Sequence, residues 1–118
     1  MSMVMKHLRG ALGEPEVPRP HLHPRRVGGS LYVDVVWEQP IGVRAAGAHL
    51  HLIAAGLEVE STGRWLVAVE PGIADAGNGR TWGTIYVELW DGSDAEFAQV
   101  EGLVVDVAGQ LGLEVRRG

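Results

Sequence analysis

Cysteine is absent from the 118-residue chain, which excludes disulfide frameworks, thiolate zinc sites and cysteine nucleophiles together. Long apolar runs are absent too, because no stretch approaches the roughly 20 residues that a membrane-spanning helix needs. The basic residues near the start are followed by no apolar stretch of signal-peptide length. We therefore expect a protein of a reducing, cytoplasmic compartment that does not insert into membranes.

Serine is scarce, none of the four serines lies in a Gly-x-Ser-x-Gly nucleophile elbow, and Ser93 already has a capping role. A phosphate-binding loop is also missing. Residues 77–80 read Gly-Asn-Gly-Arg, but they precede a predicted strand, whereas a phosphate loop follows a strand and opens a helix. The sequence therefore predicts no cofactor.

The formal net charge of −5 is unevenly distributed along the chain. Residues 1–26 contain five basic and two acidic groups, whereas residues 27–118 contain five basic and thirteen acidic groups. An acidic domain repels phosphate backbones and attracts basic partners, so we expect no nucleic-acid binding. The charge also has a simpler interpretation, which is that it only keeps the protein in solution.

Residues 14–30 contain four prolines and end in Gly28-Gly29-Ser30. Because proline disrupts helices and removes a sheet donor, this composition predicts an extended arm. Apolar residues within 1–13 would form one side of a short helix before it. We therefore divide the chain into an N-terminal segment, residues 1–29, and a folded domain, residues 30–118.

Hydrophobic periodicity predicts the elements of the folded domain. Helical spacing runs through residues 41–55, with Gly56 as the expected end, and through the segment that follows the capping box Ser93–Glu96 up to Gly112. Residues 71–80 read as a loop. Strands are expected at residues 31–37, 57–61, 64–70, 82–90 and 113–116.

An internal repeat indicates the topology. Residues 31–37 (LYVDVVW) resemble residues 85–90 (IYVELW), and each is followed by a helix and then by Gly-Leu-Glu-Val, at 56–59 and 112–115. Two strand–helix–strand units in one sheet give β-α-β-β-α-β, a ferredoxin-like arrangement. Right-handed crossovers place both helices on one face. We therefore predict an α+β, two-layer sandwich of antiparallel strands in which 64–70 is an extra strand.

The face of the sheet away from the helices holds the candidate catalytic residues. Side chains alternate along strands, so Asp34 and Glu88, equivalent in the repeat, are expected as neighbours flanked by Tyr32 and Tyr86. Two close carboxylates could share a proton or hold a divalent cation. The simpler alternative is that both are solvated on an open sheet face, or paired with an arginine across a subunit contact.

Two His-x-His pairs are candidate metal ligands. His21 and His23 lie in the proline-rich arm and are weak candidates, because they would bind zinc or nickel only with further ligands. His49 and His51 lie on a predicted helix, about 200° apart, and so cannot share an ion. We predict no metal site.

These patterns favour a small, non-enzymatic binding or assembly module that acts through the open face of its sheet. The partner would be a second copy of the chain, or a basic protein such as a toxin that it inhibits. The alternative is a small enzyme or ligand-sensing domain with an acidic and aromatic cleft on the same face. The expected contact residues are Tyr32, Asp34, Val36, Tyr86, Glu88 and Trp90.

Overall fold

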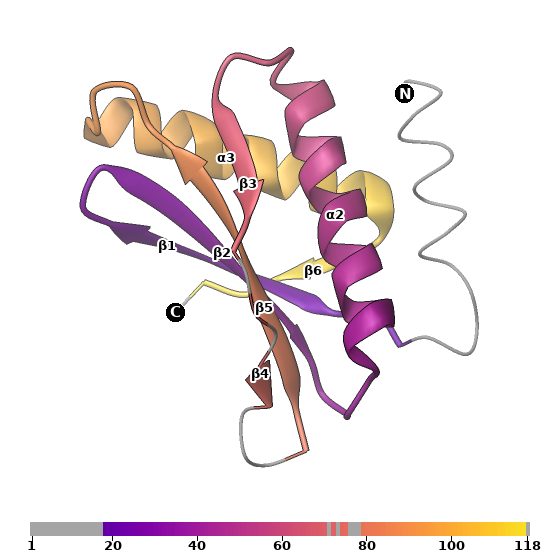
Figure 1. Ribbon diagram of the computed structural model, residues 1–118. Helices are drawn as coiled ribbons and strands as arrows, with labels where there is room; N and C mark the ends of the chain where they lie inside the picture. The colour runs from indigo at the N-terminus through magenta and orange to yellow at the C-terminus, as the bar shows by residue number, and fades with distance from the viewer. Residues whose placement is uncertain (1–17, 71, 73, 76–78, 118) are drawn as a thin grey trace.

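The computed structural model describes residues 18–70, 72, 74–75 and 79–117, and the expected N-terminal helix lies outside them. Six strands form one sheet in the order β3-β5-β2-β1-β6, with the short β4 also pairing to β5 (Figure 1). All pairs are antiparallel except β1 with β6. The elements are β1 (His21–Val27), β2 (Ser30–Trp37), α2 (Val43–Glu60), β3 (Leu66–Val69), β4 (Ala74–Asp75), β5 (Thr81–Glu88), α3 (Asp94–Leu111) and β6 (Glu114–Val115).

The helices and the sheet form two layers, as predicted for the α+β class. Burial alternates along the central strand β2: Leu31, Val33 and Trp37 are fully buried, whereas Tyr32 and Asp34 are half-buried. The buried face packs against α2 and α3, and Figure 1 shows α3 crossing behind the strands. No helix of the described residues covers the other face. Neither helix in the described part of the chain is long and apolar enough to cross a membrane.

The first strand, β1, lies in the segment that we expected to be an extended arm. It pairs with β2 along its whole length, across a two-residue turn in which Gly28 has a φ of +57°. Val27 and Ser30 form the pair that closes the turn, so alternate residues of β1 bond to β2. The backbone nitrogen of Pro24, which carries no hydrogen, therefore points away from β2. Because β6 pairs only with residues 21–22, no strand needs a donor from Pro24. The folded sheet therefore begins at residue 21, and not at residue 30.

Helix α2 continues through the predicted strand 57–61, so that prediction is wrong. Leu57 falls four residues after Ile53 and extends the buried stripe of α2. Gly56, which was expected to end the helix, lies inside it and is buried. Helix α2 ends instead at Glu60, with Ser61 as its C-cap, followed by positive φ angles at Thr62 and Gly63. The tetrapeptide Gly-Leu-Glu-Val is thus helical at 56–59, whereas at 112–115 it forms a left-handed cap and the entry to β6.

The strand order differs from that of the predicted ferredoxin-like sheet. The first strands of the two repeats, β2 and β5, are adjacent as expected, and Tyr32 faces Tyr86 across them. However, β1 is inserted between β2 and β6, and β3 is the edge strand that pairs with β5. Strand β5 ends at Glu88, two residues before the predicted end, and residues 74–75 of the predicted loop form β4.

The second helix, α3, begins and ends as predicted. The Ser93 hydroxyl accepts a hydrogen bond from the Glu96 amide at 3.1 Å, and Gly112 is left-handed with a φ of +72°. One detail differs from a capping box. The Glu96 carboxylate accepts from the amides of Trp90, Asp91 and Gly92, not from Ser93. Glu96 therefore ties the end of β5 to the start of α3.

Candidate functional site

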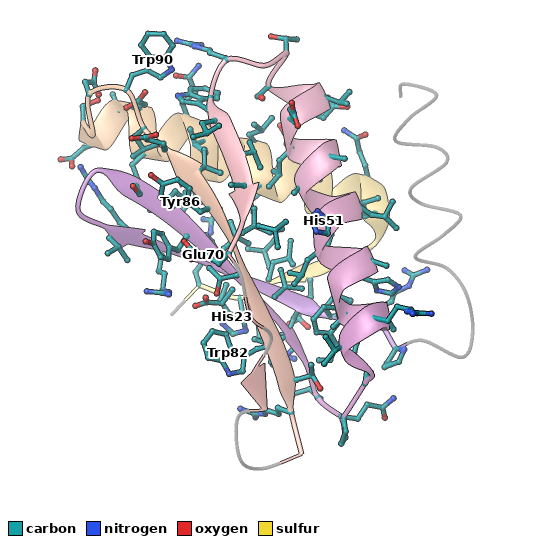
Figure 2. All side chains as sticks on the ribbon, in the orientation of Figure 1. His23, His51, Glu70, Trp82, Tyr86 and Trp90 are labelled. Atoms are coloured by element: carbon teal, nitrogen blue, oxygen red, sulfur yellow. The ribbon has the colours of Figure 1, made fainter. Side chains whose placement is uncertain are left out.

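An aromatic pair lies at the centre of the open sheet face. Tyr32 on β2 and Tyr86 on β5 are directly opposite in register, and their rings meet edge to face with centroids 5.5 Å apart. Figure 2 shows Tyr86, Glu70, His23 and Trp82 in one row over the face turned away from α3. Because aromatic side chains give large contact area at low entropic cost, this row is suited to binding.

The two candidate carboxylates are not neighbours. Asp34 is opposite Thr84, whereas Glu88 is opposite Ser30. Four residue steps therefore separate them along the sheet, which is about 13 Å at the usual rise per residue. A shared proton or a shared cation is impossible at that separation, because both need the two carboxylates within a few ångströms of each other.

Asp34 is neutralised within the same face. Its carboxylate accepts from Arg25 Nε at 2.7 Å and from the Thr84 hydroxyl at 2.8 Å. Arg25 also lies 5.0 Å from the centroid of the Tyr32 ring, a distance at which a cation interacts with the ring face. Asp34 is therefore paired with an arginine, but the arginine comes from β1 of the same chain and not from across a subunit contact.

A chain of hydrogen bonds links β1 to the end of β2. His21 Nδ1 is 2.5 Å from His23 Nε2, and His21 Nε2 is 2.6 Å from Glu38 Oε1. Arg80 Nε donates to the other Glu38 oxygen at 2.6 Å. The hydrogen bond from His21, assisted by Arg80, lowers the pKa of Glu38. Burial, together with the charges of His21 and Arg116, lowers the pKa of His23.

This histidine pair is not arranged as a metal site. The two rings turn nitrogens toward each other and not toward a common point, and the described residues include no group of three or more potential ligands. His49 is buried on α2 whereas His51 is exposed, as expected for two residues on different sides of a helix. Burial lowers the pKa of His49.

The remaining predicted contact residues lie in two places. Val36 is half-buried between His21 on β1 and Trp82 on β5, and so belongs to the open face. Trp90 lies beyond the end of β5, 79% exposed, and donates from Nε1 to the Arg64 carbonyl at 2.8 Å. Figure 2 shows Trp90 at the opposite end of the molecule from His23 and Trp82.

Trp90 and Glu88 border a hollow of about 540 Å³ at the β3 side of the sheet. The exposed Leu66 and the acidic Glu58 also line it. The predicted contact surface is therefore divided between the aromatic centre of the face and this hollow at its edge.

Sequence reasoning missed several residues of the open face. Trp82 shares the parity of Tyr86 in β5, so alternation alone was enough to find it. Glu38 carried no such signal, because its partner His21 lies on the unexpected strand β1. Comparison of the chain with protein-family models, with curated proteins and with solved structures gave no match.

Proposed function

We propose that this chain is a small, non-enzymatic binding module that contacts a basic protein through the open face of its sheet. One observation carries the proposal: Tyr32, Tyr86 and Trp82 remain partly exposed at the centre of a sheet whose two described helices, α2 and α3, lie on the other side. Aromatic residues with few lysines are typical of protein interfaces.

The charges around this aromatic centre favour a basic partner. Asp34 and Glu38 are paired with arginines of the same face, whereas Glu70 and Glu88 take part in no ion pair among the described residues. The net charge of the chain is −5. Complementary charge speeds encounter with a basic surface and opposes binding to an acidic one.

The proposal extends to the plan of the fold. Without β1 and the two-residue β4, the remaining elements follow the order β2-α2-β3-β5-α3-β6, which is the β-α-β-β-α-β sequence of a ferredoxin-like domain. We propose that the domain is of this type with one added strand, β1, in place of the extra strand 64–70. The fold alone does not specify a function.

The test uses the full chain as bait in an extract of its native host. Wild type should capture a basic protein, and the recovery should fall as salt is raised, because the contact depends on charge. The variant Tyr32→Ala/Tyr86→Ala should lose at least tenfold of that recovery. Glu88→Lys, at an exposed position, should weaken capture without removing a packed side chain.

The matched control is Val43→Ala, because Val43 is an exposed apolar residue on α2, away from the open face. It should capture the same protein as wild type. Thermal unfolding of each variant separates a lost contact from a lost fold. Equal recovery by wild type and the tyrosine variant, or recovery that does not change with salt, would refute the proposal.

A small enzyme or ligand-sensing domain is the second candidate, and the Glu38–His21–His23 chain of hydrogen bonds favours it. The Glu38 carboxylate is hydrogen-bonded to the His21 imidazole, which is hydrogen-bonded to the His23 imidazole. Such a chain can transfer protons. Here His23 would be the general base, replacing the Asp34 and Glu88 pair. Loss of any turnover in His23→Gln with retention in His51→Gln would support this role.

A further inference from the structure

The edge strand β3 lacks the features that usually protect a free strand edge, which are charge, proline or a bulge. Its sequence is Leu-Val-Ala-Val, and β5 is its only strand neighbour in the described part of the chain. The opposite edge is protected, because β6 has only two residues and is followed by Arg116 and Arg117. A further strand would therefore add most readily at β3.

The start of β3 borders an open hollow. The 540 Å³ hollow is lined by residues 63–67, which lead into and begin β3, together with Glu58 and residues 88–90. Leu66 is 60% exposed there. Helix α2 thus leaves the start of this edge uncovered.

The backbone of β3 has hydrogen-bonding groups directed outward. The Glu70 amide donates to the Thr84 carbonyl at 2.9 Å, and alternate residues of an antiparallel strand bond to the same neighbour. Leu66 and Ala68 therefore bond to β5, whereas Val67 and Val69 direct their N–H and C=O groups to the free edge. None of the backbone hydrogen bonds found in the loops, turns and caps of the described residues involves Val67 or Val69.

We propose that two copies of this chain pair through β3 as antiparallel strands related by a twofold axis at Val67. This register places Val67 opposite Val67 and Trp65 opposite Val69, so that outward-directed backbone groups meet one another. The large, exposed Leu66 of each copy then lies opposite the small Ala68 of the other. Non-hydrogen-bonded pairs of this kind bring side chains closest together.

The flanking charges select this register. It places Arg64 of each copy opposite Glu70 of the other, and so forms two pairs of opposite charge. The neighbouring twofold registers, centred on Leu66 or Ala68, leave both residues without a charged partner. Neither Arg64 nor Glu70 takes part in an ion pair among the described residues, so both charges are free to pair across the axis.

Edge pairing is independent of the proposed function, because it uses the rim of the sheet and leaves Tyr32 and Tyr86 accessible. It would join two sheets into one and place two open faces side by side. A dimer would thus present its partner with two equivalent contact surfaces, which increases avidity where the partner is itself multivalent.

Sedimentation of the full chain over a concentration series tests the dimer and its register. We expect a concentration-dependent dimer in wild type. Arg64→Glu and Glu70→Arg each place like charges opposite one another twice, and should weaken dimerisation at least tenfold. Arg64→Glu/Glu70→Arg exchanges the charges and should restore it. Arg44→Glu, the same charge change at an exposed position of α2, should dimerise as wild type does.

Hydrogen exchange of the wild-type chain gives a readout that does not depend on any variant folding. The Val67 and Val69 amides should become protected as concentration rises, whereas the Leu66 and Ala68 amides should be protected throughout. A monomer at every concentration, a dimer that the charge reversals leave unchanged, or unprotected Val67 and Val69 amides in the dimer would overturn the proposal. Loss of the dimer in Tyr86→Ala alone would also overturn it, because the open face would then be the contact.

Discussion

Gly83 allows α2 to lie close against β5, and replacing it by alanine tests how tightly the two layers pack. Gly83 is buried on the helix side of β5, and a Cβ atom added there would be 2.5 Å from Leu50 Cδ1. The normal separation of carbon atoms is about 3.5–4.0 Å, so one of the two groups must move by roughly 1 Å. Leu50 is fully buried, so its side chain can move only by shifting against other core residues.

The expected cost follows from this overlap. Overpacking a core costs about 1–3 kcal/mol, and the loss of glycine entropy in the unfolded chain returns about 0.4–1 kcal/mol. We expect Gly83→Ala to lower the free energy of unfolding by about 0.5–2 kcal/mol. At about 4–8 °C per kcal/mol for a domain of this size, the loss is visible in both thermal and urea unfolding.

Two comparisons make the result specific to Leu50. Leu50→Ala alone should cost about 2–5 kcal/mol through the cavity it leaves, but it should cost less in the Gly83→Ala background, where the new methyl group has a place to go. Gly102→Ala in α3, where an added Cβ meets nothing within 4 Å, should stabilise by up to about 1 kcal/mol. Additive effects of Gly83→Ala and Leu50→Ala would refute the close contact.

Further predictions concern charge. Burial raises the pKa of Glu96, but hydrogen bonds from Trp65 and three backbone amides together lower it to about 2 from 4.5. The stabilising effect of the Glu96 carboxylate is therefore present above about pH 4.5 and lost as pH falls toward 2. Glu96→Gln should reduce the pH dependence of the free energy of unfolding in this range, and an unchanged dependence would contradict this. Burial and the charges of His21 and Arg116 lower the pKa of His23 from 6.5, against the opposing effect of Asp34 and Glu38. Stability should therefore fall as pH drops below 6.5 in urea unfolding, and less so in His23→Gln; equal slopes would exclude the effect. Arg25→Ala should lower the free energy of unfolding by about 1 kcal/mol or less, as for other exposed pairs. Asp34→Ala should lower it by about 1–3 kcal/mol, because the buried Thr84 hydroxyl loses its hydrogen-bond partner. Equal losses in thermal unfolding would show that the Thr84 hydroxyl has another partner.

The sequence by itself determined the elements whose signals are local. The Ser93–Glu96 pair and Gly112 define α3 through contacts within a few residues of the chain, and period-two alternation in β2 and β5 correctly separated the buried from the open face. These signals are local because capping and pleating involve only near neighbours in the sequence. The α+β class and the common face of both helices followed from them.

Only the tertiary structure decided the place of β1 and the separation of Asp34 from Glu88. Proline removes a single donor, and whether that donor is needed depends on which strand lies beside it, which no local pattern records. The length of α2 was also decided by packing. Residues 57–61 have a pattern typical of a strand, but 57–60 continue the helix because Leu57 is then buried in the core. The register of β2 against β5 had the largest effect on the candidate site. It places Asp34 opposite Thr84 and Glu88 opposite Ser30, so the two carboxylates are four residues apart along the strands although they are equivalent in the repeat.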